Sequence, residues 1–383
     1  MHSCKISVVI PVYNMERTIA RAIKSFIMQK YENKELIVLD GGSTDKTLEE
    51  IEKYKEFIDF FVSQKDGGSS AAIAGNMKHI SGDYVAVLGA DDWYEEGALE
   101  AMAEACYADQ ADVFYGDFNE YLPDGQVVKK SAAKVELDMV YYQCPFNTNA
   151  AFVKRSLLNL YYTNYWINHK DELDMASDHY LWLILYHNHY KFSYISSRNP
   201  IVNFSMSGRS NKNIRKLCEQ NRNVLDYVLP KDDASYPGRA KMCDLYCATR
   251  LLAYYSEGIG KEIFQSTLKK CIHGLGEYVI FGVGHMGQEV YKVLSMVDIS
   301  PKYFVDNYAT TNSGCYKEIM IYSPEVLRDE QNLTVILASV GYEDGMEKQL
   351  HDMNLSESIK IIRYTDICYS LIQNCQGLKG DNR

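Results

Sequence analysis

The first hundred residues alternate β-branched runs with helical patterns, and this alternation constrains the fold more than any other feature of the sequence. Short apolar runs that end in turns predict strands at 6–14, 35–39, 57–63 and 83–88, and the first two are expected to be buried parallel strands. The segments between them carry apolar residues at helical spacing. Strand, loop and helix repeated in this order predict an α/β fold with a doubly wound sheet.

Acidic residues follow three of these strands at the points where the strands end. Asp40 closes the second strand, Asp66 follows the third, and the Asp91-Asp92 pair follows the fourth. Ligands of open α/β sheets bind beyond the carboxyl ends of the strands, so these acids are expected to converge there. Gly67 leaves room for a phosphate or sugar to approach the backbone. Carboxylates suit Mg²⁺ or Mn²⁺, although one acidic pair alone is also typical of a turn or a helix cap.

Roughly the first 210 residues resemble the family-two inverting glycosyltransferases of the GT-A fold, which have a mixed doubly wound sheet. The segments that carry the resemblance are SVVIPVYN (7–14), LDGGSTD (39–45), SQKDGG (63–68) and GDYVAVLGADD (82–92). The resemblance implies a nucleotide-sugar donor whose departing diphosphate is neutralised by a divalent cation. It implies nucleoside contacts by Pro11, Tyr13 and Asp40, donor contacts by Asp66 and Asp91, and Asp92 as the metal ligand.

Two departures from the family pattern refine this expectation. The second acid that the family often has after Asp40 is Gly41 here, which still suits a close turn. The Gln-x-x-Arg-Trp motif and the membrane helices of the processive members are missing from the sequence. Transfer of a single sugar is therefore expected.

An inverting displacement needs a carboxylate that takes the proton of the acceptor hydroxyl. Asp178 matches the family's downstream acid by its context, with Glu172 and Asp174 in reserve, and a helix cap is the alternative role for Asp178. Arg209 lies in a segment that resembles a loop closing over the donor, where it either assists the diphosphate or stays in solvent. The aromatic run at 161–166 is expected to pack in the core, with stacking on an acceptor sugar as the alternative.

A second strand–glycine–helix pattern begins near residue 278. Gly282, Gly284 and Gly287 follow a buried strand, and Asp306 ends the next strand about twenty residues later, the spacing of a dinucleotide fingerprint. This region resembles the small Rossmann-like domain at the N-terminus of certain sugar acetyltransferases. NAD(P) is one candidate ligand, and a nucleotide-sugar sensor or an assembly module are the alternatives.

Length and charge limit the remaining possibilities. With 383 residues, two domains and a connector are expected: a GT-A domain at 1–212, a helical connector at 213–270 and a Rossmann-like domain with a parallel sheet at 271–383. The net charge of −11 argues against nucleic acid as a partner. The ten cysteines show no zinc pattern, and no apolar run has the length of a membrane span, which favours a cytoplasmic protein that is either free or peripheral at the inner face of the membrane.

The sequence thus predicts a glycosyltransferase that moves one sugar, expected from a UDP-sugar, to an acceptor hydroxyl with inversion. The expected acceptor is a surface glycan or a lipid-linked glycan precursor. Two alternatives remain open: an NAD(P)-dependent enzyme that modifies nucleotide sugars, and a protein that binds nucleotide sugars without catalysis.

Overall fold

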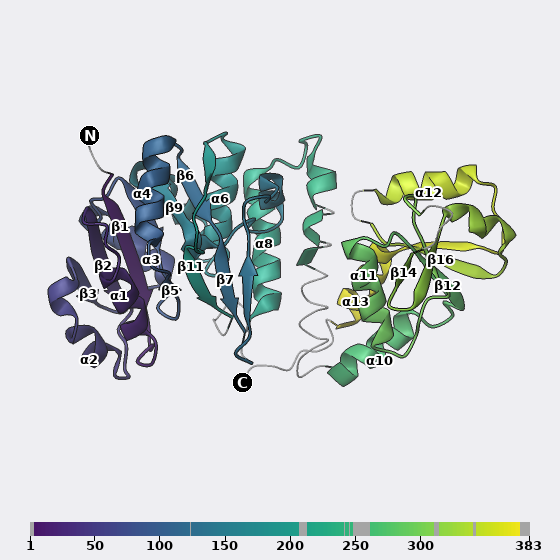
Figure 1. Cartoon of the computed structure of the whole chain (residues 1–383), viewed down its shortest axis with the longest axis horizontal. Helices are drawn as coiled ribbons and strands as arrows, with labels where there is room; N and C mark the ends of the chain where they lie inside the picture. Colours follow the sequence, from purple (N-terminus) through teal and green to yellow (C-terminus); the bar gives the residue numbers. More distant parts are fainter. Residues whose placement is uncertain are drawn as a thin grey trace. The chain divides into compact units, whose positions relative to one another are not determined.

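The structure is a computed structural model that describes residues 4–122, 124–206, 213–240, 242–244, 246–247, 261–309, 314–339 and 342–375. The chain separates into two compact units, Met1–Asp233 and Ala234–Arg383 (Figure 1). Helix α8 (Ile214–Val228) lies within the first unit, whereas the sequence pattern predicts that its residues belong to the helical connector. The predicted boundaries at 212 and 270 stay a prediction.

Within its described residues, the first unit is built on a seven-stranded sheet with the order β10-β6-β9-β4-β1-β2-β3. Neighbouring strands run parallel, except that β9 runs antiparallel to both β4 and β6. The strands are β1 (Ile6–Val12), β2 (Lys34–Asp40), β3 (Phe60–Ser63), β4 (Tyr84–Val87), β6 (Val113–Gly116), β9 (Ala151–Lys154) and β10 (Phe192–Ile195). The prediction of a doubly wound mixed sheet is confirmed, and β1 to β4 lie where strands were expected, with β1 and β2 buried and β3 partly exposed.

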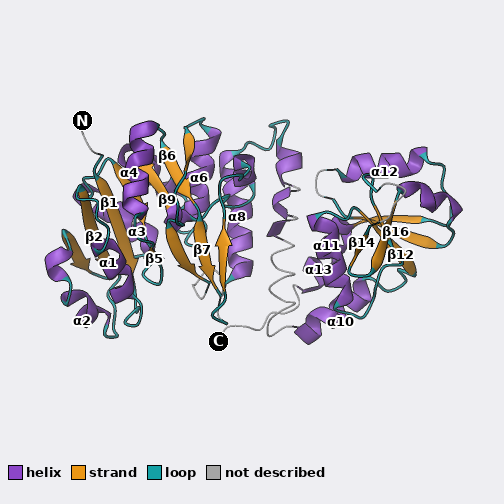
Figure 2. Cartoon of the chain, in the orientation of Figure 1, coloured by secondary structure: helices purple, strands orange, loops and turns teal. Residues whose placement is uncertain are grey.

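A second sheet of four strands, β5-β11-β7-β8, completes the strand content described for this unit. Its strands are β5 (Trp93–Tyr94), β7 (Phe118–Tyr121), β8 (Val127–Lys130) and β11 (Val202–Ser205). Helices flank the strands of the unit (Figure 2). These helices are α1 (Ile19–Ile27), α2 (Thr47–Glu52), α3 (Ser69–Asn76), α4 (Ala98–Ala108), α5 (Arg155–Asn164) and α6 (Ser177–His187), with short 3-10 turns that include η4 (Thr148–Ala150) and η5 (Trp166–Asn168).

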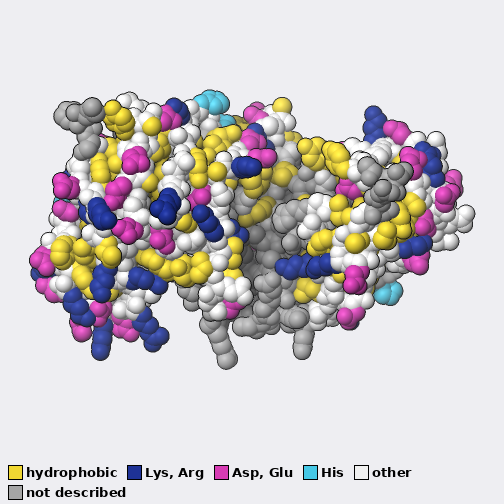
Figure 3. Space-filling view, in the orientation of Figure 1, with side chains coloured by type: hydrophobic (Ala, Val, Ile, Leu, Met, Phe, Trp, Pro, Cys, Tyr) yellow, Lys and Arg dark blue, Asp and Glu magenta, His cyan; other side chains and the backbone are white. Residues whose placement is uncertain are grey.

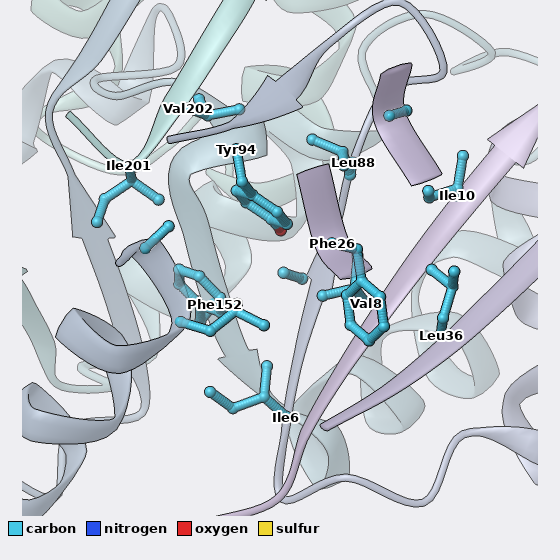
Figure 4. Packing of buried hydrophobic residues seen from close by; sticks show 14 of the residues in the cluster. Ile6, Val8, Ile10, Phe26, Leu36, Leu88, Tyr94, Phe152, Ile201 and Val202 are labelled. Carbon is cyan, nitrogen blue, oxygen red and sulfur yellow. The ribbon is translucent and has the colours of Figure 1, made fainter. Parts of the chain in front are cut away.

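Alternating residues of the central strands supply the main hydrophobic core (Figure 4). Ile6, Val8 and Ile10 of β1 point to the same face because side chains alternate along a strand, and they pack against Ile23 and Phe26 of α1. Helix α4 joins the same core, whereas α3 contacts β1 and β2, and α5 contacts β4 and β9. This layering leaves the loops at the carboxyl ends of β1 to β4 as the place where side chains of several strands can meet.

A buried polar network crosses the opposite ends of these strands. The Glu35 carboxylate accepts hydrogen bonds from the Ser7 hydroxyl at 2.5 Å and the Ser81 amide at 2.7 Å, and it pairs with the Lys5 ammonium at 2.5 Å. Burial alone would raise the pKa of Glu35, but these hydrogen bonds lower its pKa to about 2. Gly82 packs tightly against this network. A Cβ added there would lie only 2.6 Å from the Ser7 amide nitrogen, so a side chain at this position would displace the strand.

The second unit contains a six-stranded sheet with the order β14-β15-β13-β12-β16-β17 among its described residues. Its strands are β12 (Glu277–Phe281), β13 (Phe304–Val305), β14 (Cys315–Tyr316), β15 (Ile319–Tyr322), β16 (Leu333–Leu337) and β17 (Lys360–Arg363), all in parallel pairs except β14 with β15. The helices of the unit include α10 (Lys261–Cys271), α11 (His285–Ser295), α12 (Glu343–Asp352) and α13 (Tyr364–Cys375). The predicted Rossmann-like sheet is confirmed, with an antiparallel strand at one edge.

Candidate donor and catalytic site

The loops that follow β1 and β2 are joined by side-chain hydrogen bonds. The Asn14 amide donates to the Ser43 hydroxyl at 2.8 Å, and the Thr44 amide donates to Asn14 Oδ1 at 2.8 Å. Asn14 has a φ of 52°, a left-handed conformation that asparagine tolerates better than most residues. Pro11 and Tyr13 lie directly before this junction, and Tyr13 is 56% exposed, so its ring is available to a ligand.

Asp40 organises the loop after β2. Its Oδ2 accepts from the Gly42 and Ser43 amides at 3.0 Å and from the Ser63 hydroxyl at 2.6 Å, while Oδ1 accepts from the Ser43 hydroxyl at 2.5 Å. The side chain is therefore engaged within the protein, and the residue is only 1% exposed. The structure assigns Asp40 a positioning role for the loop, and its contact with a nucleoside stays a prediction.

Asp66 lies beside the loop after β2. Its Oδ1 accepts from the Gly68 amide at 2.8 Å, and a Cβ added at Gly41 would lie 3.3 Å from both carboxylate oxygens. Glycine at position 41 therefore lets the carboxylate of Asp66 approach the neighbouring loop closely. Gly67 is exposed, and Gly68, with a φ of 106°, makes the turn into α3.

Asp91 and Asp92 occupy the turn between β4 and β5, together with a cation from α1. The Arg21 guanidinium donates to the Asp91 carbonyl at 2.8 Å and stacks over the Trp93 ring at 3.5 Å. Asp92 is 2% exposed, and its Oδ1 accepts from the Ser205 amide at 2.7 Å. Burial, followed by the charge of Asp91, raises the pKa of Asp92 to about 8.

This acidic pair fits a hard divalent cation. Asp91 and Asp92 bring carboxylate oxygens from two adjacent residues into one turn, and oxygen ligands are what Mg²⁺ and Mn²⁺ prefer. Within the part of the chain that the structure describes, no three histidine, cysteine or acidic side chains gather into a metal site. The remaining ligands of a cation at Asp91 and Asp92 would therefore have to come from a diphosphate and water.

A chain of contacts connects the acidic pair to the predicted base. Gly89, two residues before Asp91, donates its amide to Asn149 Oδ1 at 2.8 Å. The next residue back, Thr148, donates its hydroxyl to Asp178 Oδ2 at 2.9 Å and accepts from Trp182 Nε1 at 3.1 Å. The turn η4 thus holds both the loop of the acidic pair and the carboxylate of Asp178.

Asp178 does not have the position of a helix cap. It lies in the first turn of α6, where the N-cap residue is Ala176, and it is only partly buried. The reserve acids are engaged elsewhere: Asp174 accepts from Gln220 Nε2 at 2.6 Å, and Glu172 accepts from the Tyr227 hydroxyl. Thr148, which had no signal in the sequence, positions Asp178.

The other predicted contacts divide into two groups. Arg209 lies outside the described residues. In the aromatic run 161–166, Tyr161, Tyr162 and Trp166 are 2%, 7% and 6% exposed, and Tyr161 donates its hydroxyl to the Ser177 carbonyl at 2.5 Å. These rings are largely buried, as expected for packing, although Tyr162 and Trp166 also line a cavity.

The glycine loop of the second unit has the geometry of its fingerprint. Gly282 has a φ of 103°, and a Cβ added at Gly287 would lie 1.8 Å from the Gly282 carbonyl oxygen, so only glycine permits this close contact of helix and strand. Asp306 is engaged by the protein: its Oδ2 accepts from the Val283 amide at 2.9 Å, and its Oδ1 accepts from the Tyr308 amide at 2.9 Å. Binding of a ribose by Asp306 stays a prediction.

The exterior adds two observations. On the face of the first unit shown in Figure 3, basic and acidic side chains are interspersed. Among the helices of the described segments, none combines the length and the apolar character needed to cross a membrane.

Comparison with known proteins shows that the first unit is similar to glycosyltransferases. Residues 7–169 match the family model "Glycosyl transferase family 2". Glycosyltransferase GlyA of Streptococcus pneumoniae is 33% identical over 30% of this chain and 17% of its own length. The cholesterol galactosyltransferase of Borreliella burgdorferi is 35% identical over 34% of this chain and 37% of its own. A third relative, the Escherichia coli UDP-Glc:alpha-D-GlcNAc-diphosphoundecaprenol beta-1,3-glucosyltransferase WfgD, is 28% identical over 46% of this chain and 68% of its own.

Among solved structures, TarS 1-349 of S. aureus in complex with UDP-GlcNAc has a TM-score of 0.47 at 20% identity, covering 76% of this chain and 81% of its own. A mannosyltransferase of Pyrobaculum calidifontis in complex with GDP-Man and Mn²⁺ has a TM-score of 0.45 at 15% identity, covering 78% of this chain and 86% of its own. The chain spans less than two fifths of the length of the first two relatives above. Residues 7–169 form a glycosyltransferase family 2 domain.

Proposed function

We propose that the protein transfers one sugar from a nucleotide-sugar donor, a UDP-sugar, to an acceptor hydroxyl with inversion at the sugar carbon. The observation that carries the proposal is the connected set of contacts that joins Asp91 and Asp92 to Asp178 through Asn149 and Thr148. It brings an acidic pair suited to a cation and diphosphate into the same neighbourhood as a carboxylate suited to accept a proton.

Each group then has a chemical task. The nucleoside lies along the loops after β1 and β2, near Pro11 and Tyr13, while Asp40 holds the second loop in place. Asp91 and Asp92 would hold the cation, which neutralises the leaving diphosphate when it is bound. Arg21 supports the same turn through the Asp91 carbonyl.

Asp178 is the proposed general base. Its Oδ1 accepts from the His179 amide at 2.8 Å and its Oδ2 from Thr148, which fixes the orientation of the carboxylate. It takes the proton of the attacking acceptor hydroxyl as the bond between the sugar and the diphosphate breaks on the opposite side. Direct displacement of this kind inverts the configuration of the sugar carbon.

The relatives suggest the acceptor class. The E. coli relative is named for a UDP-Glc donor and a diphosphoundecaprenol-linked acceptor. We extend both features to this protein: a UDP-sugar donor, and a glycan or lipid-linked glycan acceptor in surface-glycan synthesis. The proposal assigns no role in this reaction to the described residues of the second unit, and its dinucleotide site and its resemblance to sugar acetyltransferases stay predictions without support from the comparisons.

The test is a UDP- and GDP-release assay with a panel of UDP- and GDP-sugars, MnCl₂ and p-nitrophenyl glycosides, with products identified by mass spectrometry. We expect UDP release together with one added sugar per glycoside, in the opposite anomeric configuration to the donor. Binding of the donor without release would instead favour a non-catalytic binding protein. Consumption of NAD(P) with a UDP-sugar would favour the alternative enzyme.

A further inference from the structure

A cavity of about 620 Å³ lies between α3 and the α5–η5 segment. Its volume falls within the range of small-molecule sites. One side is formed by small residues of α3, where Ala71, Ala74 and Gly75 leave space along the helix. The facing side includes Tyr162 and Trp166.

The cavity begins beside the proposed reaction centre. Gly67, in the loop that follows Asp66, lines one part of it. The Ser70 hydroxyl of α3 lies 2.6 Å from the Ser177 hydroxyl, at the residue before Asp178. A molecule in this cavity would therefore extend along α3 from the neighbourhood of the proposed base.

One polar group at the cavity lacks a partner. Trp166 is 6% exposed, and its Nε1 is buried without a hydrogen-bond partner among the described residues. Buried donors in proteins are almost always paired, and leaving one unpaired costs about 1–3 kcal/mol. Nε1 itself has almost no accessible surface, so a molecule in the cavity would contact the ring of Trp166 rather than this nitrogen.

The rim adds polar groups of both signs. Lys170 and Asp171 are exposed residues that line the cavity, together with Asn159 and Thr163 of α5. Donors and acceptors beside apolar surface suit a sugar, which has hydroxyl groups at its edges and C–H groups on its faces. An alkyl chain would not use the polar groups of the rim.

We propose that this cavity binds the saccharide part of the acceptor and so determines which glycan receives the sugar. The inference rests on the proposed transferase function and extends it to the acceptor. Gly75 gives a direct test because it is an exposed helical glycine where an added Cβ would meet no atom within 4 Å. Leucine there adds bulk to the cavity wall and improves helix propensity.

The experiment compares Gly75→Leu with the matched control Gly345→Leu. Gly345 is an exposed glycine of α12 in the second unit, and an added Cβ there also meets nothing within 4 Å. For Gly75→Leu we expect at least a tenfold rise in KM for the best p-nitrophenyl glycoside of the panel, while calorimetry with UDP and MnCl₂ gives the wild-type Kd. Gly345→Leu should match the wild type in both measurements.

Trp166→Phe gives a second, milder test. The KM for the glycoside should rise about two- to tenfold, because phenylalanine gives the sugar a smaller ring to stack on, with kcat little changed. Addition of the glycoside should raise the Tm of the wild type more than that of the variant.

Three results would overturn the inference while leaving the proposed function intact. They are wild-type glycoside KM in Gly75→Leu, equal glycoside-induced Tm shifts in Trp166→Phe and the wild type, and UDP release that is stimulated by dodecyl phosphate but by no saccharide of the panel. Failure of the proposed function has a different signature, because the wild type would then release no nucleotide from any donor.

Discussion

Both units place a glycine-rich turn at the carboxyl end of a parallel strand, yet the two turns differ in what surrounds them. In the first unit, the loops after β1, β2 and β3 share hydrogen bonds or van der Waals contacts, and η4 links the loop after β4 to Asp178. In the second unit, the carboxylate of Asp306 is engaged by the Val283 and Tyr308 amides near its own loop. A strand–glycine–helix turn therefore identifies the fold of a domain, whereas catalysis requires side chains from several strand ends.

The largest expected effect on activity distinguishes Asp178 of the first unit from Asp306 of the second. Asp178→Asn should lower kcat for transfer by about 10²- to 10⁴-fold, because the acceptor hydroxyl loses its base while the amide keeps the contacts with Thr148. Asp306→Asn should transfer at the wild-type rate. Steady-state transfer assays measure both, and similar losses in the two variants would contradict the division of roles.

A smaller effect should fall on the stability of the first unit. The lowered pKa of Glu35 stabilises the fold above its unfolded value of about 4.5, and this contribution is lost as the pH falls from there to about 2. Glu35→Gln should lower the free energy of unfolding at pH 7 by about 2–3 kcal/mol, and the difference from the wild type should shrink below pH 4. Glu96→Gln, which removes an exposed pair with Lys30, is the control and should change little.

The tryptophans make this effect assignable to one unit. All three, Trp93, Trp166 and Trp182, lie in the first unit, so tryptophan fluorescence follows its unfolding alone. The fluorescence transition should shift in Glu35→Gln. An unchanged transition would mean that the buried network contributes nothing to this unit.

The smallest effect should fall on the second unit. Gly287→Ala forces a Cβ against the Gly282 carbonyl and should destabilise this unit by roughly 1–3 kcal/mol, visible by circular dichroism but not by tryptophan fluorescence. Gly284→Ala is the matched control, because an added Cβ there meets nothing within 4 Å. Loss of transfer in Gly287→Ala would show that the two units depend on each other for activity.

The sequence predicted the parts of this fold that local patterns specify. Short apolar runs predicted β1 to β4 and the acidic loops that follow them. The spacing of the glycines predicted the turn that contains Gly282 and Gly287. The sequence did not predict the roles of Thr148 and Arg21, because both depend on contacts between residues far apart in the chain. Thr148 contacts Asp178 thirty residues later, and the partner of Arg21 is Asp91. The 2% exposure of Asp92 also depends on β11, through the Ser205 amide.

Calorimetric titration of the full chain with UDP in the presence and absence of MnCl₂ tests whether Asp92 holds a cation for the donor. We predict binding that needs Mn²⁺, that is lost or weakened at least tenfold in Asp92→Asn, and that is unchanged in Asp306→Asn. Wild-type affinity in Asp92→Asn, or loss of binding in Asp306→Asn, would contradict it.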